Sequence, residues 1–219
     1  MAVLEELQQA VEKVAGAVAP SVVRIGRGPG RGGGVVVGHG AVLTNAHNLR
    51  GSETTVSFAD GRAEVGSAAG VDLDSDLAVV RVATAGATAL DWHDGEARIG
   101  ESVFAVTSPA GAGVRVTFGT VSSSGRPFRG PRGRLVPGGL EHTAPLARGS
   151  SGSPLVDEEG RLVGINTHRL GDGFYLAIPA DAQLRARVDA LARGESPRRR
   201  YLGLALLPPP AARRLRAAV

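Results

Sequence analysis

A serine in a tight, glycine-flanked turn is the residue of this chain best suited to nucleophilic chemistry. Ser151 lies in residues 148–156, Arg-Gly-Ser-Ser-Gly-Ser-Pro-Leu-Val, where the turn leads into an apolar strand. Such a turn exposes the hydroxyl and points backbone N–H groups into one concavity, as acyl transfer requires. The alternative is a small-residue loop between two strands, because serine and glycine are common turn residues.

A histidine and an aspartate upstream could activate that serine. His47 directly follows an apolar run that predicts a buried strand, so it can be held rigidly, as a general base must be. A structural role for His47 is the alternative. Asp76 adjoins the next apolar run and is best placed to be half-buried and to orient an imidazole. We expect Asp72 and Asp74 to face water.

The three aspartates at alternate positions, 72, 74 and 76, also suggest a calcium site. Such a site needs further oxygen ligands and a loop glycine, which this stretch lacks. The sequence therefore predicts no metal site here. We expect no other cofactor.

Composition favours a chain of many short strands and turns. The 219 residues are 42% hydrophobic and include 32 glycines and 13 prolines, and there is no cysteine. Disulfides and thiolate metal sites are thus excluded. No run of 18 apolar residues is present, so we expect no membrane span. No secretory leader opens the chain, which predicts a cytoplasmic location unless a leader or anchor has been removed.

Two features suggest nucleotide or nucleic-acid binding, and both are better explained otherwise. Arginines cluster in residues 126–134 and 198–200 of this basic chain, but only 4% of residues are aromatic, so no stacking platform accompanies them. We interpret these clusters as a solvated loop, within residues 125–138, and a linker. The G-x-G-x-x-G pattern of residues 28–33 precedes three valines that predict a strand rather than a helix, which argues against a dinucleotide site. We expect it to be a mobile loop that leads into a hairpin.

The spacing of apolar residues divides the chain into five parts. Residues 1–20 form an amphipathic helix, in which Leu4, Leu7, Val11, Val14 and Val18 share one face. Short strands fill residues 21–96 and 97–180, joined by a polar connection at 84–97. A second helix spans residues 181–194, and residues 195–219 are a linker followed by a tail or the truncated beginning of another domain.

Three blocks resemble the signature segments of trypsin-like serine proteases of the HtrA (Deg) type. They are residues 44–47, Thr-Asn-Ala-His, residues 75–79, Ser-Asp-Leu-Ala-Val, and residues 149–156. Further similar blocks are residues 119–122, 164–167 and 177–179, so the resemblance covers about residues 5–193. It implies an all-β fold of two six-stranded antiparallel barrels with the site in the cleft between them.

The resemblance also implies a role for each residue. Ser151 attacks the peptide carbonyl, His47 carries the proton and Asp76 orients His47. Backbone N–H groups of Gly149 and Ser151 form the oxyanion hole, with Ser150 as a third donor. The family usually has asparagine and glycine where this chain has Ser150 and Ser153. Serine resists some backbone angles open to glycine, so we expect the turn to switch less freely.

The segments that should line the specificity pocket contain no acidic residue. We expect a shallow apolar pocket, walled by Pro145, Leu146, Ala147, His168, Arg169 and Leu170. This composition predicts a preference for small aliphatic P1 residues such as Val, Ala or Leu.

These inferences predict a serine endopeptidase that cleaves unfolded or misfolded proteins and peptides in quality control. A latent protease fold with a chaperone-like or peptide-binding role is the alternative. The resemblance suggests a homotrimer built through the N-terminal segment. Residues 199–204 resemble the start of a PDZ domain, but they are too few to assign it a function.

Overall fold

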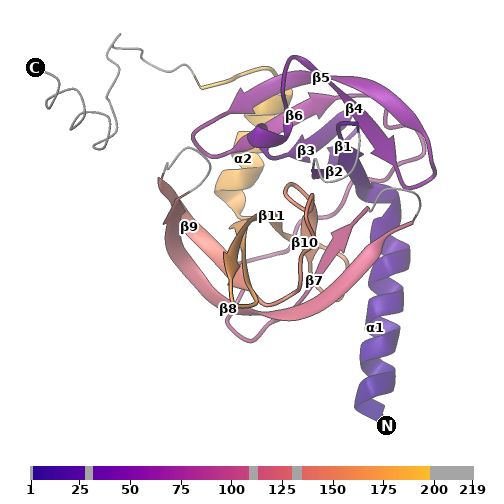
Figure 1. Ribbon diagram of the computed structural model, residues 1–219, viewed down its shortest axis with the longest axis vertical. Helices are drawn as coiled ribbons and strands as arrows, with labels where there is room; N and C mark the ends of the chain where they lie inside the picture. Colours follow the sequence, from indigo (N-terminus) through magenta and orange to yellow (C-terminus); the bar gives the residue numbers. More distant parts are fainter. Residues whose placement is uncertain (1, 28–31, 109–112, 130–134, 198–219) are drawn as a thin grey trace, which may run out of the picture.

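The computed structural model describes residues 2–27, 32–108, 113–129 and 135–197. The arginines of residues 130–134 and 198–200, the tail, and the first glycines of the G-x-G-x-x-G pattern lie outside the described residues. Two closed six-stranded antiparallel barrels make up the body of the protein, as predicted (Figure 1).

The first barrel has the strand order β1-β2-β3-β6-β5-β4. Its strands are β1 (Val22–Ile25), β2 (Gly33–Gly38), β3 (Ala41–Thr44), β4 (Glu53–Phe58), β5 (Ala63–Asp72) and β6 (Leu77–Arg81). Short 3-10 helices η1 (Ala19–Ser21) and η2 (Ala46–Asn48) precede β1 and follow β3. The η2 turn holds His47.

The second barrel has the strand order β10-β11-β12-β9-β8-β7. Its strands are β7 (Ser102–Thr107), β8 (Arg115–Arg129), β9 (Leu135–His142), β10 (Pro154–Val156), β11 (Leu162–Gly171) and β12 (Phe174–Pro179). The expected loop over residues 125–138 was therefore too long. Strands β8 and β9 extend into it and pair as far as Arg129 with Leu135.

Apolar side chains fill both barrels and the layer between them. Successive residues of a strand point to opposite faces, so Val22 joins the layer between the barrels while Val23 points into the first barrel. Val35 and Val36 divide in the same way. Because both faces of these strands are buried, the sequence shows continuous apolar runs rather than alternation.

Two helices join parts of the chain that are distant in sequence. Helix α1 (Ala2–Val18) packs its buried residues Val14 and Val18 into the layer between the barrels and contacts β7 and β8. Its first turns extend past the second barrel, so the expected apolar face is only partly buried, and Leu4 is 73% exposed (Figure 1). Helix α2 (Ala182–Ala192), capped by the Asp181 side chain, returns to pack on β5 and β6.

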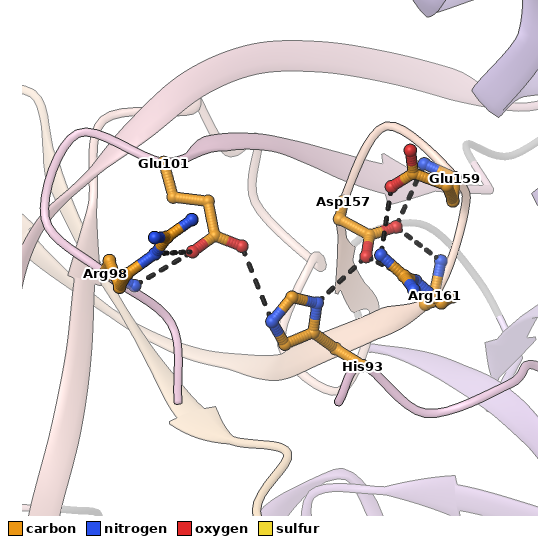
Figure 2. A network of polar contacts seen from close by, with 6 residues as sticks. All are labelled: His93, Arg98, Glu101, Asp157, Glu159 and Arg161. Carbon is orange, nitrogen blue, oxygen red and sulfur yellow. Dashed lines mark hydrogen bonds and ion pairs between the residues drawn. The ribbon is translucent and has the colours of Figure 1, made fainter. Parts of the chain in front are cut away.

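A polar network fastens the connection between the barrels to the second barrel. His93 lies between two carboxylates, with Nδ1 2.9 Å from Asp157 and Nε2 3.6 Å from Glu101 (Figure 2). Arg161 donates to the same Asp157 carboxylate at 2.8 Å. Burial raises the pKa of Asp157, but the hydrogen bonds from His93 and Arg161 outweigh it and hold the pKa below its usual value.

Helix α2 lies so close to β5 that only glycine fits at the contact. A Cβ added to Gly70 would lie 2.5 Å from the carbonyl oxygen of Leu191. We expect Gly70→Ala to lower the free energy of unfolding by roughly 1–3 kcal/mol, because the helix must shift to admit the methyl group. Denaturation in urea measures this change.

Gly16→Ala is the matched control for that substitution. Gly16 lies on the exposed face of α1 with no atom within 4 Å of an added Cβ. Alanine should there raise the free energy of unfolding by up to about 1 kcal/mol through helix propensity. Equal effects of the two substitutions would contradict the close packing of α2.

Among the described residues, no helix combines the length and the apolar character needed to cross a bilayer.

Candidate active site

His47 and Asp76 are joined by a short hydrogen bond in the first barrel. The Nδ1 atom of His47 lies 2.7 Å from one carboxylate oxygen of Asp76, and the His47 backbone N–H donates to the other at 3.0 Å. Because a carboxylate can only accept, Nδ1 carries the proton. The Nε2 atom of His47 is therefore left as a proton acceptor, as a general base requires.

The backbone of Asp76 is strained and held by its neighbours. Its φ of +55° lies in the left-handed region, which costs a non-glycine residue roughly 1–3 kcal/mol. The side chain of Asn45 and the backbone N–H of Ala46 both donate to the Asp76 carbonyl, at 2.9 and 3.1 Å. These bonds tie the loop that carries the acid to the segment that carries His47.

Asp72 is buried, contrary to the expectation that it faces water. It is only 5% exposed, and one carboxylate oxygen accepts the backbone N–H groups of Asp74 and Ser75. Its other oxygen lies 3.3 Å from Arg187 of α2. Asp72 thus shapes the turn that leads to Asp76, while Asp74 is exposed, as expected.

The turn that carries Ser151 is compact and depends on its glycines. Gly149 and Gly152 have φ values of +84° and +90°. A Cβ on Gly152 would lie 2.3 Å from the carbonyl oxygen of Gly33, so this position admits no side chain. Within the described chain, the backbone N–H groups of Gly149, Ser150 and Ser151 donate to no protein acceptor. No acceptor in that part of the chain therefore competes for these three donors.

The two unusual serines of this turn are accommodated without left-handed backbone. Neither Ser150 nor Ser153 has a positive φ. The Ser150 hydroxyl donates to the carbonyl of Ala147 at 2.8 Å, and the buried Ser153 hydroxyl accepts from Asn166 at 3.2 Å.

Thr167 of β11 connects Ser151 to Asp76, and its part was not predicted. Its hydroxyl donates to Asp76 at 3.3 Å, and its backbone carbonyl accepts the hydroxyl of Ser151 at 3.0 Å. Both Ser151 and His47 lie in the described part of the chain, and there the two side chains bond to Thr167 and Asp76 rather than to each other. Thr167 thus joins Ser151 to Asp76, and Asp76 in turn holds His47. The place of Thr167 in a family-like block was its only signal in the sequence.

The segments expected to form the specificity pocket are linked to each other. The guanidinium of Arg169 donates to the carbonyl of Leu146 and lies 5.6 Å from the ring centre of Tyr175. The Leu146 side chain is buried in the core of the second barrel. The other four predicted wall residues are exposed, namely Pro145, Ala147, His168 and Leu170.

A cavity lies apart from these residues. Its volume is about 810 Å³, and it is lined by the start of α2, residues 92–97 and parts of β8 and β9. Neither His47 nor Ser151 lines it. We therefore do not place the chemistry in this cavity.

A buried histidine supports the Ser151 turn through the side chain of Asn166. His142 is fully buried, and its Nε2 lies 2.9 Å from the side-chain oxygen of Asn166. The nitrogen of that amide donates to the carbonyls of Ser153 and Pro154 at 3.1 and 3.2 Å. Since the amide oxygen can only accept, Nε2 of His142 donates. Burial lowers the pKa of His142 to about 4, so the ring is neutral at pH 7.

This lowered pKa predicts acid sensitivity. Below pH 6.5 the unfolded chain binds a proton at His142, whereas the folded chain does so only near pH 4. Stability from this group is therefore complete above pH 6.5 and is lost, by up to about 3 kcal/mol, as the pH falls to 4. We expect His142→Gln, which keeps a donor for Asn166, to lose less stability than the wild type between pH 7 and 4.5. Urea denaturation at both pH values measures this, and identical losses would contradict the assignment.

The chain is similar in sequence to known proteins. A family model described as a trypsin-like peptidase domain matches residues 32–165. The serine protease PepD of Mycobacterium tuberculosis is 33% identical, over 85% of this chain and 47% of PepD. The mitochondrial serine protease HTRA2 of Drosophila virilis is 32% identical, over 80% of this chain and 45% of that protein.

Solved structures agree with these relatives. The serine endoprotease from Yersinia pestis superimposes with a TM-score of 0.71 at 29% identity, over 84% of this chain and 66% of that chain. The present chain spans about half the length of the curated relatives named above. With this fold and these matches, the chain belongs to the trypsin-like serine peptidases, and within them to the HtrA type.

Proposed function

We propose that this chain is a serine endopeptidase in which Ser151, His47 and Asp76 form the catalytic triad. The observation that carries the proposal is the 2.7 Å bond between Asp76 and Nδ1 of His47, which leaves Nε2 as the base. The contacts of Thr167 with both Asp76 and Ser151 support it further.

The proposed reaction proceeds in two stages. The Ser151 oxygen attacks the carbonyl carbon of the scissile peptide while Nε2 of His47 takes the hydroxyl proton. The backbone N–H groups of Gly149, Ser150 and Ser151 bind the oxyanion. His47 then gives its proton to the leaving amine as the C–N bond breaks. A water molecule, deprotonated by His47 in turn, releases the acyl group from Ser151.

We propose small aliphatic P1 residues and unfolded proteins as substrates, in protein quality control. The named relatives are serine proteases, which supports protein substrates. The positive charge of Arg169, anchored on Leu146, argues against Lys or Arg in the pocket, because like charges repel. The exposed wall residues Pro145, Ala147 and Leu170 offer apolar surface for a short side chain.

One observation favours the latent alternative. The Ser151 hydroxyl donates to the carbonyl of Thr167 rather than to His47. In a latent module this contact would persist, and the fold would bind unfolded chains without cutting them. A latent fold that binds peptides is therefore the second candidate function.

A fluorophosphonate probe tests the nucleophile and the oxyanion donors together. We expect the wild type to be labelled on Ser151 and to hydrolyse casein. Ser151→Ala should abolish labelling and lower the rate on the order of a million-fold. Asp76→Asn should lower kcat about 10⁴-fold, because His47 loses the partner that fixes its tautomer. An unlabelled but folded wild type that still binds casein would favour the latent alternative.

A peptide library tests the proposed specificity. Cleavage should occur mainly after Val, Ala or Leu, since the segments that would form the pocket carry no acidic residue. Mass spectrometry of the products identifies the P1 residue, with Ser151→Ala as the control for contaminating proteases. Products that end mainly in Arg or Lys would contradict the proposed pocket.

A further inference from the structure

Asn48, the residue after His47, reaches from the first barrel to the Ser151 turn of the second. It is 5% exposed, and its amide nitrogen donates to the carbonyl of Ser151 at 2.8 Å. The same nitrogen lies 2.9 Å from the hydroxyl oxygen of Thr44. The general base and the nucleophile turn are thus linked through a side chain adjacent to His47.

The neighbours of this amide fix its orientation. The Thr44 hydroxyl gives its proton to the Gly33 carbonyl at 2.7 Å, so toward Asn48 its oxygen can only accept. The carbonyls of Ser151 and Gly33, at 2.8 and 3.5 Å, are acceptors as well. Exchange of the amide oxygen and nitrogen would set an oxygen against these carbonyls, so the nitrogen must face the turn.

Two glycines at the start of β2, Gly32 just before the strand and Gly33 as its first residue, make room for this contact. A Cβ on Gly32 would lie 2.3 Å from Cγ of Asn48, and a Cβ on Gly33 would lie 3.0 Å from Cβ of Ser153. The backbone N–H of Gly33 also donates to the Ser151 carbonyl, at 2.8 Å. Two donors of the first barrel therefore hold one carbonyl of the second, and glycines of the G-x-G-x-x-G stretch permit it.

The side-chain oxygen of Asn48 indicates that the bond from its amide nitrogen to Ser151 serves the site rather than stability. The side-chain oxygen of Asn48 is buried and accepts no hydrogen bond from any part of the chain that is described. A buried acceptor without a partner costs about 1–3 kcal/mol. An apolar residue of similar size would avoid this cost, but it would also lose the bond to Ser151.

We propose that Asn48 is a positioning residue, which holds Ser151 in the correct position relative to His47. The carbonyl that it holds belongs to the peptide unit directly after the Ser151 Cα, so the bond limits rotation of the residue that carries the nucleophile. The inference rests on the proposed function, because it affects rate only if Ser151 is the nucleophile. A misplacement of about 1 Å costs on the order of a hundredfold in rate.

Asn48→Leu tests this role, because leucine has similar size and no donor. Fluorophosphonate labelling and peptide hydrolysis should be measured below the unfolding transition of each variant. We expect labelling and kcat to fall about 10- to 100-fold, with KM changed less than about twofold. Asn48→Asp should show the same loss at pH 8, since an ionised carboxylate cannot donate to Ser151. If Asn48→Leu does not fold, Asn48→Asp gives the measurement.

Val80→Ala is the matched control for lost stability. Val80 is fully buried in the core of the first barrel and does not touch the site. Its truncation should lower the unfolding midpoint and leave the labelling rate of the folded protein unchanged. Folded Asn48 variants that are labelled at the wild-type rate would overturn the inference, whereas an unlabelled wild type would instead overturn the proposed function.

Discussion

The fit of one barrel against the other is the constraint on which the site depends. His47 and Asp76 belong to the first barrel, while Ser151 and Thr167 belong to the second. Side chains from two bodies keep a sub-ångström arrangement only if the surface between the bodies is close-packed. Here the outer faces of β1, β2 and β6 pack with those of β7, β10 and β11 into one apolar layer, which α1 and α2 complete. Hydrogen bonds between the barrels then fix their relative position more closely.

The polar bonds across the barrels converge on the two turns that carry the site. The backbone carbonyl of Ser151 accepts hydrogen bonds from two donors of the first barrel. The Asp76 carboxylate accepts one from the hydroxyl of Thr167, on β11 of the second barrel. Each turn is therefore supported by both barrels. Such bonds are worth about 1 kcal/mol each in net stability. Their main effect is directional, because they admit only one relative placement of the two bodies.

Much of the fold was predictable from sequence, and so were the residues of the candidate site, because both depend on local signals. The apolar runs gave the strands, and the short blocks around His47, Asp76 and Ser151 gave the family. The contacts of Thr167 with Asp76 and of Asn48 with Ser151 were not predictable, since the partners lie 91 and 103 residues apart along the chain. Burial of Asp72 was missed for the same reason: its cation, Arg187, lies on the last helix.

The contact between Ser151 and Thr167 is too weak to make the chain inactive by itself. A hydrogen bond from a hydroxyl to a carbonyl contributes about 1 kcal/mol net, so giving it up slows a reaction about fivefold. Enzymatic accelerations are larger by many orders of magnitude. True latency would require that the oxyanion donors be lost, yet the N–H groups of Gly149 and Ser151 have no competing acceptor in the described chain. The balance of these terms supports the proposed peptidase, in which we expect substrate binding to turn the serine hydroxyl toward His47.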